Sequence, residues 1–342
     1  KLVACSSAPC CRARCSRCGR AASQPVVPET TARPASSSRS MLRGADVEIA
    51  QLEPGPLRGH HLRAGLPGGE ISWIVTNLPL RGRGHFPAGI WTLSVVTGAG
   101  GRALQHGVEV STGTQFVHGP GAEQDGTYGR DFSVVCLCLR DEIFLASLKN
   151  EFPELEAAID RQWLVSEPSE HGRTHLIEQF EQAAVVLRTD EEVRSSVTAK
   201  LVMQDELLGA FLEGLAGGVE QTPMPAIANA AALVRRAEAF AKEPGTNPLC
   251  VSDLCLRCGV PRRTLSHAFH QVLGMGPATY LRRLRLNQVR RTLRQFRATD
   301  RRSTVKSVAL DNGFWHAGRF GSQYRELFGE SPLESTRRLG AR

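Results

Sequence analysis

The sequence predicts an α+β protein, with a β-rich region first and helices after it. Three observations lead to this fold class. Before residue 140, short runs of β-branched and aromatic residues alternate with glycine and proline turns. From residue 141 onward, apolar residues recur at helical spacing. After residue 249, a short helix, a glycine turn and a second helix are predicted twice.

The first 40 residues are predicted to be a disordered tail. They contain seven Lys and Arg, one acidic residue, and many Ser, Ala and Pro. This composition buries too little apolar surface to fold, and it provides neither a transmembrane helix nor a secretory apolar segment. Because Met41 follows it, residues 1–40 are also a candidate for upstream translation outside the native protein.

Residues 41–140 are predicted to form a β-rich domain. The β-prone runs lie at 47–52, 71–77, 90–97, 108–117 and 132–139. Clusters of glycine and proline separate them, as at 67–69 and 119–121. This spacing indicates a small barrel or sandwich.

Residues 141–217 are predicted to be a helical connector. One apolar stripe consists of Leu176, Ile177, Phe180, Ala184 and Leu187. A second consists of Val193, Val197, Leu201, Leu208, Phe211, Leu212 and Leu215. These helices can pack on the β-rich domain or pair with a second copy in a homodimer. Residues 218–227, with Pro223 and Pro225, are the predicted linker.

The repeated pattern occupies 251–274, VSDLCLRCGV and PRRTLSHAFHQVLG, and 305–332, VKSVALDNGF and WHAGRFGSQYRELFGESP. In each copy a glycine follows the first helix, where a left-handed residue is needed to turn the chain. The predicted core of the two units consists of Leu254, Gly259, Leu265, Phe269, Gly313, Phe314, Phe320 and Tyr324. Two helix-turn-helix units in tandem predict a protein that reads DNA.

This tandem arrangement resembles the AraC/XylS family of bacterial transcription regulators. The resemblance is most specific at 311–320, DNGFWHAGRF, and 327–332, LFGESP, and the DNA-binding domain is predicted at 228–340. It implies a cytoplasmic, effector-responsive activator that binds double-stranded DNA and RNA polymerase. It also implies a cupin-like N-terminal barrel that senses an unknown small molecule. Pro261 departs from the family, where a serine commonly caps the recognition helix.

Charge divides the chain in the same way. Residues 226–342 hold 21 Lys+Arg against 8 Asp+Glu, a net +13, whereas residues 41–225 hold 14 against 25, a net −11. With +6 from residues 1–40, the sum is the overall +8. A basic domain joined to an acidic one indicates that only the first meets phosphates.

Candidate base readers are polar residues near the start of each second helix, because that end enters the major groove. They are Arg262, Arg263, Ser266 and His267 in the first unit, and His316, Arg319 and Ser322 in the second. Between the units a helix is predicted from Pro277 to about Phe296. Its phosphate-contacting candidates are Arg282, Arg283, Arg285, Arg290 and Arg291. Each named residue can instead be a solvated surface residue.

Two alternative classes place a metal in the chain. A cupin-type metalloenzyme would use histidines and a carboxylate, for which His60, His61, His85, His106, His118 and Glu109 are available. A zinc-cysteine alkyl-transfer sensor would use Cys5, Cys10, Cys11, Cys15 and Cys18. No histidines have tight His-x-His spacing, and these cysteines lie in a segment without core-forming residues. We therefore expect no catalytic residue, metal or cofactor, and no membrane partner.

Overall fold

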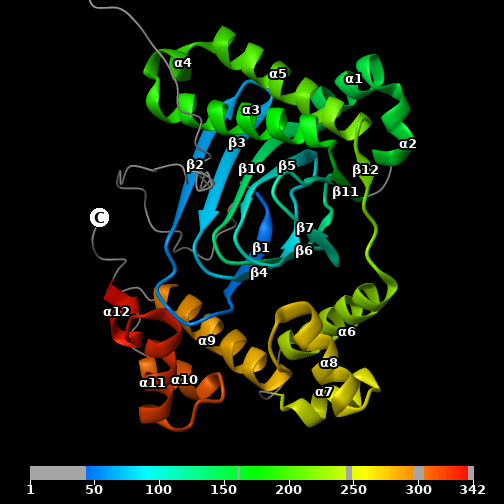
Figure 1. Ribbon diagram of the computed structural model, residues 1–342. Coiled ribbons are helices and arrows are strands. Elements are labelled where there is room, and N and C mark those ends of the chain that lie inside the picture. Colours follow the sequence, from blue (N-terminus) through cyan, green and yellow to red (C-terminus); the bar gives the residue numbers. More distant parts are fainter. Residues whose placement is uncertain (1–43, 160–161, 244–248, 296–303, 338–342) are drawn as a thin grey trace, which may run out of the picture. The chain divides into compact units, whose positions relative to one another are not determined.

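The computed structural model describes residues 44–159, 162–243, 249–295 and 304–337 (Figure 1). Strands predominate up to residue 140 and helices after it, so the α+β prediction is confirmed. The predicted tail, with its five cysteines, and Phe296 lie outside the described residues. No described helix is long and apolar enough to cross a membrane.

The strands form two antiparallel sheets. The five-stranded sheet has the order β1-β4-β9-β6-β7. Its strands are β1 (Asp46–Gln51), β4 (Leu80–His85), β9 (Glu123–Tyr128), β6 (Ala103–Gln105) and β7 (Val108–Val110). The seven-stranded sheet has the order β12-β11-β8-β5-β10-β3-β2. Its strands are β12 (Val219–Glu220), β11 (Trp163–Glu167), β8 (Gln115–His118), β5 (Ile90–Ala99), β10 (Phe132–Arg140), β3 (Gly69–Thr76) and β2 (Gly59–Leu66).

The expected cupin-like barrel is not confirmed, because no ladder closes these two sheets into one ring within the described part of the chain. Two facing sheets bury the same alternating positions without closing the hydrogen-bond ladder. Strand β10 shows the alternation: Val134, Cys136 and Cys138 belong to the core between the sheets. Val135, Leu137 and Leu139 belong to the core on the other face. The seven-stranded sheet is therefore buried on both faces.

Helices cover the outer face of the seven-stranded sheet (Figure 1). They are α1 (Asp141–Glu151), the 3-10 turn η1 (Pro153–Leu155), α2 (Glu156–Ile159), α3 (Glu170–Thr189), α4 (Glu191–Ser195) and α5 (Val197–Ala216). The predicted stripe of α3 points inward, with Phe180 fully buried. In the second predicted stripe, Phe211 of α5 is fully buried, whereas Val197 and Leu201 near the start of α5 are exposed. Hydroxyls of Ser169 and Ser196 accept backbone N–H bonds at the starts of α3 and α5. Within this mainly helical segment, β11 returns to the sheet.

Among the residues that the structure describes, seven helices form the C-terminal part. They are α6 (Pro225–Lys242), α7 (Val251–Cys258), α8 (Arg262–Leu273), α9 (Pro277–Gln295), α10 (Val305–Asp311), α11 (Ala317–Phe328) and α12 (Pro332–Arg337). One core joins α6, α7, α8 and the first half of α9, and it also includes Leu52 and Leu104 from the β-rich region. A second core joins the rest of α9 to α10 and α11. Helix α9 therefore links two separate helical cores.

Candidate nucleic-acid interface

The first helix-turn-helix unit consists of α7 and α8. Helix α7 is followed by Gly259, whose φ of 65° is left-handed. A Cβ there would meet no atom within 4 Å, so the backbone conformation alone favours glycine. Leu254, Leu265 and Phe269 are fully buried and pack α7 against α8 and α6. The structure thus places the predicted core residues of this unit in one cluster.

The second unit consists of α10 and α11. Gly313 has a φ of 81° and follows α10 at the matching position. Phe320 and Tyr324 are buried in the second core, where Phe314 is half-buried against them. The Tyr324 hydroxyl lies 2.7 Å from the Ser335 hydroxyl of α12. The second unit therefore repeats the first around the same glycine turn.

The starts of α8 and α11 are left open toward solvent. Pro261 precedes α8 and His316 precedes α11, and neither side chain caps its helix. Free N–H groups and the positive end of the helix dipole remain available to an anion at both starts.

The candidate readers lie on the outer faces of α8 and α11. Arg262, Arg263 and His267 are exposed, and Ser266 is half-buried beside Leu265. In the second unit, His316, Arg319 and Ser322 are exposed. The Ser322 hydroxyl donates to the Gly318 carbonyl at 3.1 Å, which occupies its proton within the helix. Both recognition-helix faces are therefore open to solvent.

Two arginines of α9 bind the β-rich region. Arg283 donates to the Leu52 carbonyl, and Arg291 pairs with Glu48 of β1. Burial lowers the pKa of Arg283, and Arg282 beside it has the same effect. Arg283 and Arg291 are therefore engaged within the chain.

Of the other three predicted phosphate contacts, two have partners within the chain. Arg285 donates to the Leu249 carbonyl, and Arg290 pairs with Glu330 at 2.9 Å. Arg290 also lies over the Phe328 ring, 4.4 Å from its centroid. Arg282 is exposed and has no hydrogen bond or ion pair with any described residue. Of the five candidates, Arg282 alone is unpartnered within the described chain.

Strand β1 contacts α9 and the end of α11 through residues that sequence reasoning missed. The Asn287 side chain of α9 accepts from the Gln51 backbone N–H at 2.9 Å and donates to the Gln51 carbonyl at 3.0 Å. The Gln51 side chain donates to the Leu327 carbonyl near the end of α11 at 2.6 Å. Gly55 N–H donates to the same carbonyl at 3.1 Å. Because β1 is an edge strand, the backbone N–H and carbonyl of Gln51 are available for the two bonds with Asn287.

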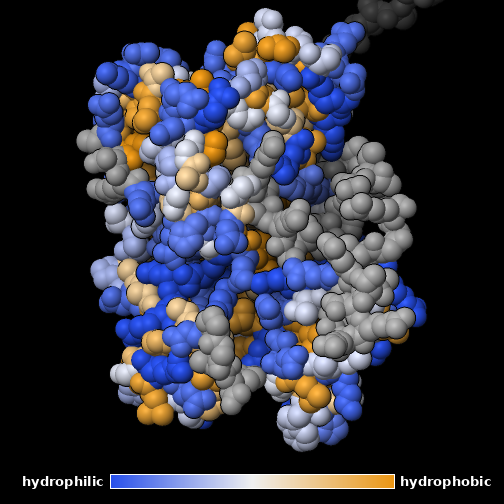
Figure 2. Space-filling view, turned by 180° about the vertical axis from the view of Figure 1, so that it is seen from behind, coloured by the Kyte–Doolittle hydropathy of each residue, from blue (hydrophilic) through white to orange (hydrophobic). Residues whose placement is uncertain are grey.

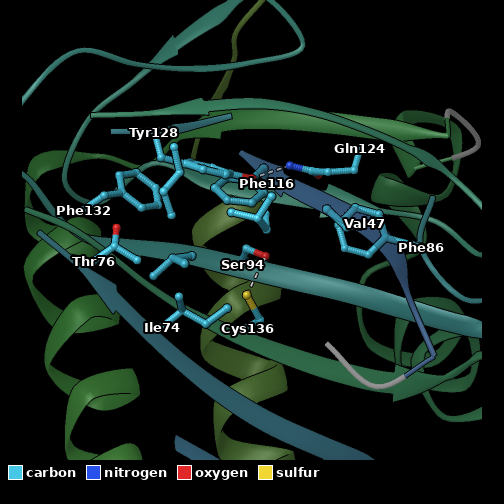
Figure 3. Close-up of a pocket in the computed structure, with 13 residues that line it drawn as sticks. Val47, Ile74, Thr76, Phe86, Ser94, Phe116, Gln124, Tyr128, Phe132 and Cys136 are labelled. Atoms are coloured by element: carbon cyan, nitrogen blue, oxygen red, sulfur yellow. Dashed lines mark hydrogen bonds between the residues drawn. The ribbon is translucent and has the colours of Figure 1, made fainter. Parts of the chain in front are cut away.

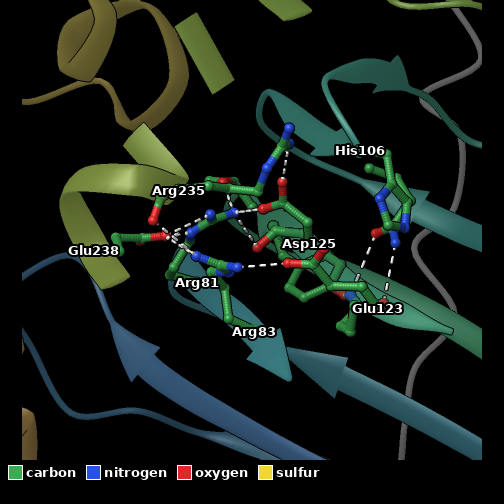
Figure 4. A network of polar contacts seen from close by, with 12 residues as sticks. Arg81, Arg83, His106, Glu123, Asp125, Arg235 and Glu238 are labelled. Atoms are coloured by element: carbon green, nitrogen blue, oxygen red, sulfur yellow. Dashed lines mark hydrogen bonds and ion pairs between the residues drawn. The ribbon is translucent and has the colours of Figure 1, made fainter. Parts of the chain in front are cut away.

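A buried ion cluster joins the five-stranded sheet to α6 (Figure 4). Arg81 of β4 pairs with Asp125 of β9 at 2.6 Å and with Glu238 of α6 at 2.9 Å. Arg83 pairs with Glu238 at 3.0 Å, and Arg235 pairs with Asp125 at 2.7 Å. Arg81, Asp125 and Glu238 are each at most 4% exposed. No spacing in the sequence indicates these contacts, because residues 81 and 238 are far apart in the chain.

The cluster keeps its carboxylates ionised. Burial raises the pKa of Glu238, but the neighbouring Arg81, Tyr280 and Arg83 outweigh it and lower the pKa below its usual value. The same balance lowers the pKa of Asp125, through Arg81, Arg235 and Arg83. The Tyr280 hydroxyl of α9 donates to Glu238. Sheet, α6 and α9 thus share one charged contact.

The candidate metal ligands do not converge. Of the six, His106 and His118 come together, with their Nε2 atoms 3.2 Å apart. His61 instead bonds to the Ser72 hydroxyl, and Glu109 pairs with Arg102. Within the residues that the structure describes, no three His, Cys, Asp or Glu side chains are placed to hold a metal. Cys255 and Cys258 are half-buried and buried in the first core.

Comparisons with known proteins agree with this geometry. A family model described as "Helix-turn-helix domain" matches residues 254–338. The "Probable thc operon regulatory protein" of Rhodococcus erythropolis is 29% identical over 184 residues, covering 54% of this chain and 51% of that protein. The "XylDLEGF operon transcriptional activator 1" of Pseudomonas putida is 40% identical over 76 residues, 22% of each chain.

The chain spans about half of the first of these curated relatives, and less of the second. Among solved structures, the AraC-like transcriptional activator CuxR aligns with 71% of this chain and 86% of its own. That alignment has 16% identity and a TM-score of 0.39.

Proposed function

We propose that the chain is an effector-responsive regulator that binds specific sites in double-stranded DNA. Through residues 254–338 it belongs to the AraC/XylS family of transcription regulators. The observation that supports this most directly is the pair of open recognition-helix faces. Arg262, Arg263 and Arg319 project from them without an intramolecular hydrogen bond or ion pair among the described residues. An arginine in the major groove can donate two hydrogen bonds to guanine.

The two units dock in successive major grooves of one DNA face. Helix α9 has 19 residues, a length of about 28 Å at 1.5 Å per residue. Successive major-groove openings on one side of B-DNA are about 34 Å apart. A rigid helix of this length is a suitable spacer between the two recognition helices.

Regulation acts through the contacts that hold the helical units to the β-rich region. Arg283 and Arg291 of α9 are occupied by Leu52 and Glu48. When these contacts open, both arginines become available to DNA phosphates. An effector that binds one arrangement better than the other shifts the population between them. The phosphate role of Arg283 and Arg291 therefore belongs to the DNA-bound arrangement.

The outer helices are the proposed dimer face. On α5, Val197 is 61% exposed, Leu201 42% and Val202 51%. Figure 2 shows hydrophobic patches among hydrophilic side chains at the end of the molecule that includes α3 and α5.

We assign the chain a cytoplasmic role as an activator that recruits RNA polymerase, and we assign it no catalytic residue.

The test is a selection of bound sequences from random duplex DNA by the full chain. Wild type is expected to select two half-sites about one helical turn apart. Changing Arg262 and Arg263 to Ala should degrade one half-site, with a loss of about 1–3 kcal/mol of discrimination per lost guanine contact. Arg319→Ala should degrade the other half-site, and Arg140→Ala, at the exposed end of β10, should change neither.

Selection without any sequence preference would contradict the proposal. A uniform loss of affinity when Arg262, Arg263 and Arg319 are changed to Ala would mean that these arginines contact phosphates and that other residues read the bases.

A further inference from the structure

An exposed tryptophan precedes the second recognition helix. Trp315 lies in the connection between α10 and α11, and it is 82% exposed. Its ring lies beside that of His316, with the ring centroids 5.2 Å apart. Its indole N–H makes no hydrogen bond to any residue that the structure describes.

The other three of the four tryptophans are packed within the fold. Trp91 is 8% exposed and donates its indole N–H to Asp141 at 2.6 Å. Trp73 is half-buried and donates to the Ser133 hydroxyl at 3.0 Å, and the half-buried Trp163 stacks on a histidine ring. Figure 3 shows phenylalanine and tyrosine rings enclosed in the same way between the two sheets. An aromatic ring left in water gains no stability from burial, so a partner outside the chain best explains Trp315.

The turn of the second unit is longer than that of the first. Residues 259–261 join α7 to α8, whereas residues 312–316 join α10 to α11. Phe314 in this longer turn packs back on the core, with its ring centroid 5.2 Å from that of Phe320. Trp315 follows Phe314 and faces solvent, directly before His316 at the start of α11. This is the end of a recognition helix that enters the major groove.

The outer face of α11 is thin beside Trp315. Ala317 and Gly318 are both exposed in its first turn. A Cβ on Gly318 would meet no atom within 4 Å, and Gly318 does not have a left-handed φ, so nothing in the described chain requires glycine there. Glycine is unfavourable in a helix relative to alanine, but it permits a close approach of the backbone to a partner. These small residues allow the start of α11 to lie close to base edges.

We propose that the Trp315 indole contacts the C5 methyl group of a thymine in the half-site bound by the second unit. The proposal rests on the DNA-binding function proposed above and adds a base to it. Thymine displays a methyl group in the major groove, and apolar side chains recognise it by direct contact. Arg319 can donate to guanine, so the two side chains read different bases. A protein surface is the other class of partner for an exposed tryptophan, and it is less suited to the end of a helix that enters the groove.

The first measurement uses the duplex that selection by the full chain recovers. Each thymine of that duplex is replaced in turn by deoxyuridine, which lacks only the C5 methyl group. Wild type should lose about fourfold in affinity at one position, the size expected for burial of one methyl group. That position should lie in the half-site that Arg319→Ala degrades, and the other replacements should each change affinity by less than about twofold.

The variants assign this preference to one side chain. Trp315→Ala should bind the thymine and deoxyuridine duplexes equally, whereas Trp315→Phe keeps an apolar ring and should retain a difference of about twofold or more. Leu256→Ala is the matched control, because Leu256 is also 82% exposed but lies on α7, outside the recognition helices. It should leave the fourfold difference unchanged. Circular dichroism checks that each variant folds, as expected for exposed positions.

A second measurement follows Trp315 itself. Acrylamide is a neutral quencher of exposed tryptophan fluorescence. The difference in quenching between wild type and Trp315→Phe belongs to Trp315, because the other tryptophans are buried or half-buried. Binding of the selected duplex should remove most of this difference, since the indole is then covered by DNA.

Equal affinity for thymine and deoxyuridine at every position would overturn the proposal, as would a difference that persists in Trp315→Ala. Protection from acrylamide without a deoxyuridine effect would place Trp315 on sugar or phosphate. Quenching that is unchanged by DNA would leave Trp315 to a protein partner, and either result overturns the thymine contact. Selection without sequence preference would contradict the regulatory function and this contact with it. A selected sequence that is insensitive to deoxyuridine would contradict the contact alone.

Discussion

Glu238→Gln should destabilise the protein more than any single change at an exposed ion pair. In the wild type, three arginines face three carboxylates in the cluster: Arg81, Arg83 and Arg235 against Glu123, Asp125 and Glu238. The substitution keeps the side-chain shape but leaves three positive charges facing two negative ones. Arg81, at 4% exposed, cannot recover the lost interaction from water.

Removing one partner of a buried ion pair typically lowers the free energy of unfolding by about 3–5 kcal/mol. The amide oxygen that Glu238→Gln introduces still accepts hydrogen bonds from the arginines, so a loss of about 3 kcal/mol is expected. Arg81→Met should cause a loss of similar size, because it leaves Glu238 and Asp125 with fewer cations. The double variant restores two charges of each sign. Its loss should therefore be smaller than the sum of the single losses by about 2 kcal/mol.

The assay is urea unfolding of the wild type, the two single variants and the double variant, followed by circular dichroism at pH 7. The control is the exposed pair Arg140 and Glu142, whose side chains are 50% and 68% exposed. The corresponding substitutions there should leave the unfolding midpoint near that of the wild type and be additive. Additive effects within the buried cluster, or losses no larger than those of the control pair, would refute the reasoning.

Three further outcomes are expected. Burial lowers the pKa of His106 to about 4 from 6.5, so the unfolded chain binds the proton first. The neutral ring contributes fully to the free energy of unfolding above pH 6.5, and this contribution falls by about 3 kcal/mol as the pH drops toward 4. Urea unfolding at pH 7 and pH 5 should show the first part of this fall in the wild type and less of it in His106→Gln. Gly259→Ala should lower the free energy of unfolding by about 1–2 kcal/mol, because the φ of Gly259 is 65°. Gly321→Ala, in open space within α11, should instead raise the free energy of unfolding by up to about 1 kcal/mol. Equal effects of the two substitutions would contradict the assigned turn at Gly259. Arg282→Ala should reduce the slope of log affinity for DNA against log salt by about 1, and an unchanged slope would exclude a phosphate contact at Arg282.

The helix-turn-helix units could be predicted because their signals are local. A left-handed residue between two short helices requires glycine at positions 259 and 313 whatever surrounds them. The apolar residues that pack each pair of helices lie close to that glycine in the sequence. Such short-range requirements remain visible in a single sequence.

The contacts of α9 could not be predicted in this way. An arginine within an arginine-rich run looks available for phosphate. Arg283 nevertheless binds Leu52, which lies 231 positions earlier in the chain, and Arg291 binds Glu48, which lies 243 positions earlier. Asn287 matches the free backbone of Gln51 only once β1 is an edge strand. The expected barrel was not confirmed for a related reason. Alternating apolar residues fix which side chains face inward, but they do not determine whether the strands close into a ring.

The ion cluster couples the β-rich region to the helical units that are proposed to bind DNA. Tyr128 and Asp125 are on β9, and Asp125 shares Arg81 with Glu238 of α6. If an effector bound to the β-rich region changes the position of β9, it changes the free energy of the contacts that keep Arg283 and Arg291 of α9 occupied. Linkage then requires reciprocity: DNA binding must change the affinity of that molecule by the same factor by which the molecule changes the affinity for DNA. The direction follows from which arrangement the ligand prefers, and ligand titrations with and without operator DNA measure it.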